Sequence, residues 1–282
     1  MKLWKFLLFF FLFALATSLF VRISTDGFKE GNVAVISIKG VITNERVLFE
    51  TNAVSDDILL LIDQAEEDPQ IKAVVFEIES PGGYVVPSEE IANKIKTMKK
   101  PTVAVIRNVG ASGAYWIASA TDYVIASKVS ITGSIGVQSS YLDFAGLMRR
   151  YNVTYNRLTG GEYKDMGSPF KELSEDERVK LAKKINMIHQ YFANEVAANR
   201  NISSEKMQEI ATGEFYLGVE ALELGLIDQI GNMDTAKKYL EEKLGKSVSY
   251  QYYNKYKPSL KELFTARLFS SSPVSNLEIK VQ

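Results

Sequence analysis

The chain of 282 residues contains no cysteine and a single histidine, His189. Without cysteine there is no disulfide, no catalytic thiolate and no cysteine-ligated metal, and one histidine argues against a zinc site. We therefore expect neither a metal nor a cofactor. The same scarcity argues against a Ser-His-Asp triad, because His189 lies in a long, charged, amphipathic segment.

The sequence also lacks an excess of charge of either sign. Its 33 Lys and Arg residues nearly balance 34 Asp and Glu residues, which gives a formal net charge of −1. Such a balance offers no electrostatic basis for nucleic-acid binding. A chain with 46% hydrophobic and 24% charged residues is an ordinary globular protein. Its length suffices for one large domain or two small ones.

One long hydrophobic run is present, at the N-terminus. Lys2 and Lys5 precede an uncharged apolar segment, residues 6–21, in which only Thr17 and Ser18 are polar. Counted from Leu3, the run approaches the roughly 20 residues that span a bilayer. The positive-inside rule leaves the N-terminus in the cytoplasm and exports the chain beyond residue 21. Ala14-Leu15-Ala16 resembles a small-residue cleavage site and leaves a cleaved signal peptide open as an alternative, although the length favours a retained anchor.

Strand-like and helix-like segments alternate through the first half of the chain. We expect strands at residues 33–38, 71–78, 102–106, 123–126 and 131–137, and helices at 55–67, 88–98 and from 112 onward. The second half is more helical, with helices expected at 174–199, 203–211 and 234–244. This alternation predicts an α/β fold with parallel strands and right-handed crossovers.

Ser112 is the candidate nucleophile. It lies in Gly-Ala-Ser-Gly-Ala-Tyr-Trp (residues 110–116), after a predicted strand and before a predicted helix. Such a junction exposes a side chain beside backbone N–H groups that can hold an oxyanion. A hydroxyl needs a base, and Ser-Lys pairs are a known variant of the triad. Lys164, in Gly-Glu-Tyr-Lys-Asp (residues 161–165), is the best candidate.

A second loop belongs to the same candidate site. Ser-Pro-Gly-Gly (residues 80–83) follows a predicted strand, at the end where α/β sheets place their ligands. Its glycines allow a backbone N–H to approach a substrate carbonyl closely, and Gly113 supplies a second N–H. Each motif also has a plain structural interpretation. Ser112 could mark a tight junction, Lys164 could be a solvated loop residue, and Ser134 could be a turn serine.

The ordered set of motifs resembles the signal peptide peptidase A family of serine proteases. That family shares the Clp-protease and crotonase fold of repeated β-β-α units. The resemblance covers most of residues 33–244. It rests on five segments: 80–83 (SPGG), 111–115 (ASGAY), 132–137 (TGSIGV), 163–170 (YKD with SPF) and 218–222 (GVEAL).

The resemblance implies a role for each candidate residue. Ser112 is the nucleophile and Lys164 the general base. The N–H groups of Gly83 and Gly113 form the oxyanion hole, and the Ser134 hydroxyl orients the lysine. Burial in an apolar site lowers the pKa of a lysine, so that the neutral amine can accept the serine proton.

The resemblance also implies an assembly and a location. The chain holds one copy of the motif set and resembles the short family form, a homo-oligomeric ring in which serine and lysine of neighbouring protomers meet. Residues 1–22 would be the anchor, 23–32 a connector, 33–253 the protease domain and 254–282 a tail. We expect a single-pass protein of the bacterial inner membrane, with its catalytic domain on the periplasmic or outer side.

The expected substrates are signal-peptide remnants and other membrane or exported polypeptides. Two rival interpretations remain open: a non-catalytic membrane scaffold on the same fold, and a crotonase-type acyl-CoA enzyme. An exported location argues against the second, because CoA chemistry belongs in the cytoplasm.

Overall fold

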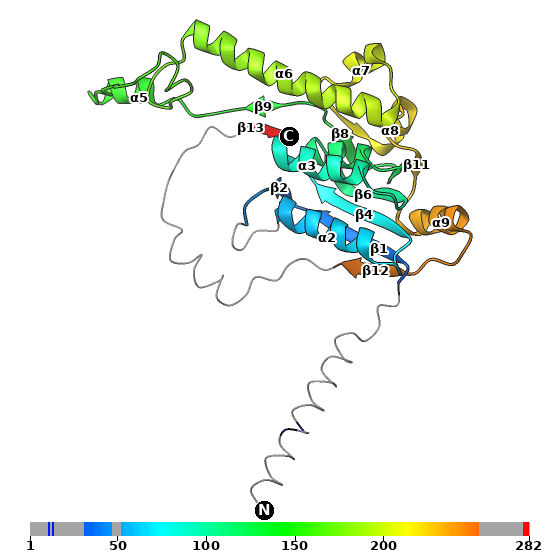
Figure 1. Cartoon of the computed structure of the whole chain (residues 1–282). Helices are drawn as coiled ribbons and strands as arrows, with labels where there is room; N and C mark the ends of the chain where they lie inside the picture. Colours follow the sequence, from blue (N-terminus) through cyan, green and yellow to red (C-terminus); the bar gives the residue numbers. More distant parts are fainter. Residues whose placement is uncertain (1–10, 12, 14–30, 47–51, 254–278, 282) are drawn as a thin grey trace, which may run out of the picture.

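A computed structural model of the chain describes residues 11, 13, 31–46, 52–253 and 279–281. Its central element is a mixed sheet with helices on both faces (Figure 1). The strands of this main sheet are β1 (Val33–Lys39), β4 (Ala73–Ser80), β6 (Thr102–Ala111), β7 (Tyr123–Ala126), β8 (Ile131–Gly133), β10 (Phe215–Leu217), β11 (Gln229–Ile230) and β12 (Tyr250–Tyr253).

The main sheet is predominantly parallel, as the alternation of strands and helices predicts. Its order is β10-β8-β6-β4-β1-β12, with β7 beside β6 and β11 beside β7. All of these pairs are parallel except β10 with β8. The central strand β6 divides its outer edge between two partners. Residues 103–106 pair with β7, and residues 109–111 pair with β8. The carboxyl-terminal end of β6 therefore pairs with β8, and the candidate site begins at this end.

A smaller second sheet lies at the carboxyl ends of β1 and β4. Its order is β3-β2-β5-β13-β9. The members are β2 (Val41–Thr43), β3 (Asn52–Val54), β5 (Gly83–Tyr84), β9 (Gln138–Ser139) and β13 (Ile279–Val281). Chain order thus runs β1, β2, β3, then a helix, and again β4, β5, then a helix.

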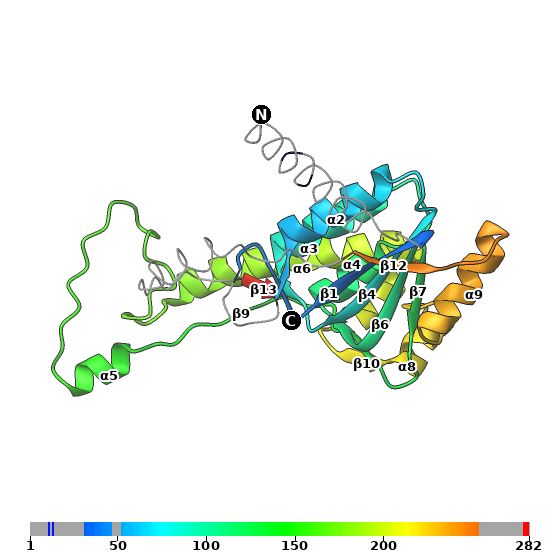
Figure 2. The same cartoon turned by 90° about the horizontal axis from the view of Figure 1, so that it is seen from below.

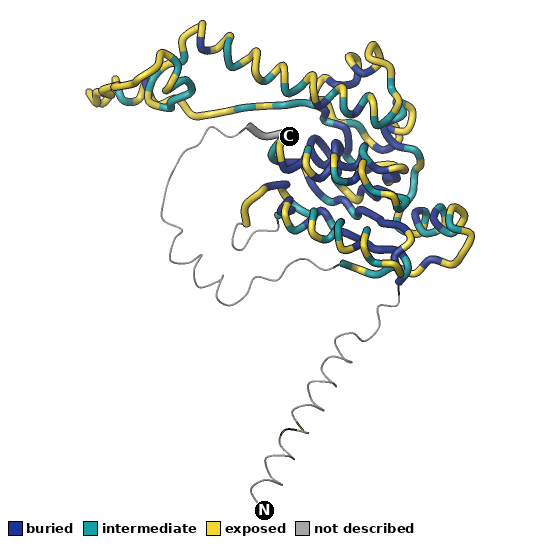
Figure 3. Tube along the Cα trace, viewed as in Figure 1, coloured by how far each residue is buried: buried dark blue, intermediate teal, exposed yellow. Residues whose placement is uncertain are grey.

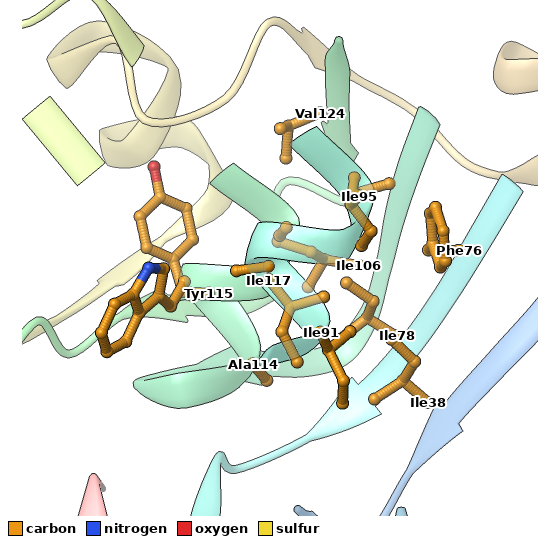
Figure 4. Close-up of a cluster of buried hydrophobic side chains, with 14 of the residues drawn as sticks. Ile38, Phe76, Ile78, Ile91, Ile95, Ile106, Ala114, Tyr115, Ile117 and Val124 are labelled. Atoms are coloured by element: carbon orange, nitrogen blue, oxygen red, sulfur yellow. The ribbon is translucent and has the colours of Figure 1, made fainter. Parts of the chain in front are cut away.

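The helices are α2 (Ser55–Glu67), α3 (Val85–Lys96), α4 (Gly113–Ser119), α5 (Ala145–Arg150), α6 (Glu175–Arg200), α7 (Ser204–Ile210), α8 (Gly218–Leu224) and α9 (Met233–Leu244). Successive strand residues point to opposite faces of the sheet, so the central strands contribute side chains to two hydrophobic cores, one on each face. On one face Ile36, Phe76 and Ala104 pack with α2, α3 and α4 (Figure 4). On the other face Val35, Val75 and Val105 pack with buried residues of α9, the helix at the right of Figure 2.

One segment leaves this body as an arm. After β9 the chain runs outward to α5 and then returns through a loop to α6, the long helix along the top of Figure 1. Most residues from 138 to 174 are exposed or half-buried, in contrast to the buried body (Figure 3). Helix α6 begins at a capping box, in which Ser174 and Glu177 exchange hydrogen bonds.

Two predicted boundaries shift for local reasons. The helix expected at 88–98 begins at Val85, because Pro87 is well accommodated in a first turn. The strand expected at 131–137 ends at Gly133, because Gly133 and Ser134 both adopt positive φ angles, 72° and 50°.

The predicted anchor, connector and tail lie almost wholly outside the described residues. Within the described part, no helix has the length and apolar character needed to cross a membrane. Of the expected tail, the structure describes β13. Within the predicted protease domain, 33–253, the structure describes every residue except 47–51.

Candidate active site

Ser112 occupies the junction between β6 and α4. Its backbone has φ 57° and ψ −126°, a combination that is strained for any residue with a side chain. The strain is held from both sides, because Ser112 N–H donates to the Gly133 carbonyl at 2.7 Å and Ser112 C=O accepts from Trp116 N–H at 2.9 Å. The side chain is fully buried, and among the described residues its Oγ has no hydrogen-bond partner. Strained backbone positions of this kind cluster at functional sites, and a buried hydroxyl without a partner calls for an explanation.

The helix behind Ser112 is fixed by its own aromatic residues, which belong to the core. The Tyr115 hydroxyl donates to the Leu226 carbonyl at 2.7 Å. The Trp116 ring stacks on Phe192 of α6, with centroids 4.6 Å apart. Both side chains have no exposed surface, and Figure 4 shows Tyr115 within the buried cluster. Tyr115 therefore supports the nucleophile from below and does not line a groove.

The two glycines assigned to the oxyanion hole lie next to each other. A Cβ on Gly113 would lie 3.6 Å from Gly83 N and 2.3 Å from Ser88 Oγ. A Cβ on Gly83 would lie 2.0 Å from the Ile42 carbonyl oxygen. At both positions an added Cβ would force a neighbouring atom to move, so the two loops pack closely at the start of α4. Their role as oxyanion donors stays a prediction, and the closeness of the two glycines is compatible with it.

Ser134 lies on the other side of Ser112. It follows Gly133, whose carbonyl accepts from Ser112 N–H, and its own N–H donates to Glu214 C=O at 2.8 Å. Its hydroxyl donates to the Gly213 carbonyl at 3.2 Å. Ser134 is therefore beside the candidate nucleophile, but within one chain its hydroxyl contacts a backbone carbonyl and no described lysine.

Lys164 is not brought to Ser112 within a single chain. It is exposed and lies in the loop of the arm between α5 and α6, whereas Ser112 is inside the body (Figures 1 and 2). Ion pairs of the residue that follows Lys164 hold the loop around it. The Asp165 carboxylate lies 2.5 Å from the Arg157 guanidinium and 3.4 Å from Lys171 Nζ. Lys164 is thus held on a defined loop that lies apart from the nucleophile of its own chain.

An extended backbone segment lies beside the glycine pair. Strand β13 is antiparallel to β5, with Val281 opposite Gly83 and residue 280 opposite Tyr84. Its other edge is antiparallel to β9, with residue 280 opposite Gln138. The space between β5 and β9 therefore accepts a polypeptide strand, next to Gly83. We name this strand position, which β13 occupies here, the groove. Sequence reasoning missed β5, β9 and this groove, because the strands have two residues each and carry no periodic signal.

The other groups singled out in the sequence are elsewhere. His189 is on α6, where it lines a cavity of about 260 Å³ with Thr212 and Gly213, and its Nε2 has no described partner. It makes no described hydrogen bond to Ser112. No sequence pattern indicated the buried pair Arg200–Asp228, whose two hydrogen bonds of 2.8 and 2.9 Å join α6 to the loop before β11.

Comparison with known proteins assigns the chain to a family. Residues 94–247 match the sequence profile of peptidase family S49. The chain is 34% identical over 239 residues to the Enterococcus faecium protein named "Putative signal peptide peptidase SppA", a match that covers 81% of this chain and 69% of that protein. It is 38% identical over 184 residues to "Putative protease MJ0651" of Methanocaldococcus jannaschii, covering 64% of this chain and 59% of the other.

A third relative is more distant and much longer. "Protease 4" of Haemophilus influenzae is 30% identical over 213 residues, which cover 74% of this chain but 34% of the relative. Several relatives therefore extend well beyond the part that this chain matches. The matched region contains Ser112, Gly113, Ser134 and Lys164 together with most of the main sheet. The chain belongs to peptidase family S49, among the homologues of signal peptide peptidase A.

Proposed function

We propose that this protein is a membrane-anchored serine endopeptidase that uses a Ser112–Lys164 dyad on a Clp-protease/crotonase-type fold. The observation that carries the proposal is the environment of Ser112. Its unpartnered hydroxyl lies at a strained junction, beside Gly83 and Gly113 and close to a groove that accepts an extended strand. A hydrolase of peptide bonds needs these three features together.

The reaction follows from the groups available. The neutral amine of Lys164 removes the Ser112 proton as Oγ attacks the scissile carbonyl. The N–H groups of Gly83 and Gly113 stabilise the oxyanion, and the lysine then returns the proton to the leaving amine. Water hydrolyses the acyl-enzyme by the same steps. Ser134, beside Ser112, accepts a hydrogen bond from the ammonium and sets its direction.

The base comes from a neighbouring protomer. Lys164 lies on an arm whose apolar side chains are unusually exposed, including Leu158 at 98%, Leu142 at 71% and Tyr151 at 69%. Exposed apolar groups of this extent are typical of an interface with another chain. A second copy that covers the arm brings its Ser112 to this Lys164, and burial then favours the neutral amine.

Membrane anchoring and substrate class belong to the same proposal. The apolar run from Leu3 to Val21 confines the enzyme to the bilayer surface of a bacterial inner membrane, with its domain on the outer side. Signal-peptide remnants and other membrane or exported polypeptides share that surface and reach the site as extended chains.

Complementation between inactive variants tests the nucleophile, the base and their division between protomers. We expect Ser112→Ala and Lys164→Ala each to reduce peptide cleavage to about a few percent or less, because nucleophile and base act as a unit. When the two variants are co-expressed, activity should reappear in the oligomeric fraction alone. Lys184→Ala, which removes an exposed lysine of α6, is the matched control and should retain activity.

Each failure has a distinct meaning. Residual activity in either single variant removes that residue from the mechanism. Silent mixed oligomers would place the whole dyad within one subunit. A wild-type protein that assembles but cleaves no peptide and does not react with a serine-directed phosphonate would identify a non-catalytic scaffold.

A further inference from the structure

A cavity of about 820 Å³ lies between the starts of α2 and α3 and the middle of α6. Its walls are apolar and include Val85, Val86, Met187 and Ile188. Val86 and Met187 are 57% and 60% exposed, although both lie in regular helices of the body. Side chains of this kind suit the aliphatic part of a ligand.

Carboxylates stand around these apolar walls. Asp56, Glu89 and Glu90 all line the cavity. In the described part of the chain none of the three forms an ion pair, although their neighbours Asp57 and Asp63 pair with Arg46 and Lys94. Glu89 accepts a hydrogen bond from the Tyr191 hydroxyl at 2.7 Å, which raises the pKa of that tyrosine to about 12. The cavity thus presents unneutralised negative charge at the rim of an apolar pocket.

A buried hydroxyl completes the cavity. Ser55 lines it, has no exposed surface, and its Oγ lacks a hydrogen-bond partner among the described residues. A buried polar atom without a partner is costly unless a ligand or water satisfies it. The lining therefore combines apolar walls, unpaired carboxylates and a free polar atom, the groups that an aliphatic cation requires.

The two helix N-termini at the cavity do not reverse its preference for a cation over an anion. Helices α2 and α3 both begin there, and a helix N-terminus acts as about half a positive charge. Two such ends supply roughly one positive charge, which is less than the charge of Asp56, Glu89 and Glu90 together. A cation is therefore favoured over an anion.

The cavity adjoins the peptide groove at a defined position. Tyr84 lines the cavity and is the residue of β5 that lies opposite residue 280 of β13. Directly opposed residues of an antiparallel pair point to the same face of the sheet. A substrate residue at this position therefore points to the side of Tyr84. In this chain's own strand the residue at that position is a lysine, Lys280.

We infer that this cavity is a specificity subsite for a basic side chain, lysine or arginine, one residue before the substrate residue that lies opposite Gly83. The aliphatic stem lies along Val85 and Ile188, and the cationic group meets the carboxylates of Asp56, Glu89 and Glu90. This inference rests on the proposed peptidase function. It adds a charge requirement at one substrate position, which the catalytic residues do not supply.

A peptide series on the detergent-solubilised full-length enzyme tests the subsite. Each fluorogenic peptide carries lysine, norleucine or glutamate at one position N-terminal to the scissile bond, and the substitution is moved along the peptide. At a single position lysine should exceed norleucine about tenfold in kcat/KM, mainly through KM, and glutamate should be poorest. The lysine preference should weaken at high salt.

Variants that replace the cavity carboxylates by amides test whether the preference for lysine arises from the cavity. In Asp56→Asn/Glu90→Gln the ratio of lysine to norleucine cleavage should fall toward one, and adding Glu89→Gln should abolish it. Glu67→Gln is the matched control, because it removes an exposed carboxylate from the far end of α2, about 16 Å from Asp56. This control should keep the wild-type ratio.

The outcomes separate this inference from the proposed function. A wild-type enzyme that cleaves none of the peptides contradicts the peptidase itself. An active enzyme without a basic preference, or with a preference that survives the triple variant, contradicts the subsite. If the variants change the oligomeric state by size-exclusion chromatography while the ratio stays constant, the cavity binds a neighbouring subunit and the inference is wrong.

Discussion

At the scale of single residues, the site depends on backbone positions that exclude ordinary side-chain geometry. Ser112 adopts a positive φ of 57° although it is not glycine, and Ser134 does the same at 50°. Such conformations cost on the order of 1–3 kcal/mol each and persist only where surrounding contacts enforce them. Here the Ser112 N–H bond to Gly133 C=O connects Ser112 to the residue that precedes Ser134. This hydrogen bond therefore helps to hold the strained backbone at both Ser112 and Ser134.

The two glycines near Ser112 should differ in their tolerance of alanine. An added Cβ at Gly83 meets a backbone carbonyl oxygen at 2.0 Å, whereas at Gly113 it meets the Ser88 hydroxyl at 2.3 Å. A side chain can turn away more readily than a strand can move. We expect Gly83→Ala to lower the free energy of unfolding by about 3 kcal/mol and Gly113→Ala by about 1 kcal/mol.

Chemical denaturation followed by circular dichroism measures both losses. Gly160→Ala is the control, because an added Cβ there has no neighbour within 4 Å. It should change the unfolding free energy by less than about 0.5 kcal/mol. Equal losses at Gly83 and Gly113 would show that β2 and β5 separate easily, contrary to the tight approach of their backbones.

At the scale of elements, the carboxyl ends of β1, β4 and β6 carry a charged cluster on the sheet face that also packs against α9. Glu77 of β4 lies 2.8 Å from Lys39 Nζ of β1 and 3.7 Å from Arg107 of β6. Burial by itself would raise the pKa of Glu77. The hydrogen bond and charge of Lys39, the Ser37 hydroxyl and Arg107 outweigh it and hold the pKa below the usual value.

This depressed pKa predicts a loss of stability in acid. A carboxylate with a lower pKa in the folded state contributes stability at pH values above its unfolded pKa, and the contribution disappears as the pH falls through the folded value. Glu77→Gln should therefore unfold at a lower temperature than wild type at about pH 7, and the difference should shrink as the pH falls through the lowered folded-state pKa of Glu77. Thermal melts across this range measure the effect. A difference that is constant with pH would mean that Glu77 contributes by packing alone.

The elements also show how far the fold can be predicted from sequence. The helix at 55–67 and the strand at 123–126 have the predicted bounds, because their apolar periodicity is created by the cores they face. The short strands β2, β5 and β9 were not predicted, since pairing with distant segments defines them. The proximity of Gly83, Ser112 and Ser134 could be anticipated from strand ends. The separation of Lys164 from Ser112 within one chain was expected from the family resemblance alone, because the path of the arm has no periodic pattern.

At the scale of the whole molecule, the hydrophobic N-terminus should decide where the protein is found. The mostly apolar stretch from Leu3 to Val21 approaches the roughly 20 residues that hold a chain in a bilayer. Full-length protein should sediment with membranes, resist extraction at high pH and be cleaved by added protease only from the outer side. A variant without residues 1–22, expressed in the cytoplasm, should remain in the supernatant. Recovery of a soluble mature form that begins after Ala16 would show that the segment is a cleaved signal.

The stacking of Trp116 on Phe192 has a practical consequence for experiments on this molecule. The sequence has two tryptophans, Trp4 in the hydrophobic run and Trp116 directly behind the candidate nucleophile. Once residues 1–22 are removed, all tryptophan fluorescence comes from one fully buried indole. The emission spectrum then reports on the helix that carries Gly113, and a red shift measures the entry of water at that helix. The protein thus contains an intrinsic optical probe at its own candidate active site.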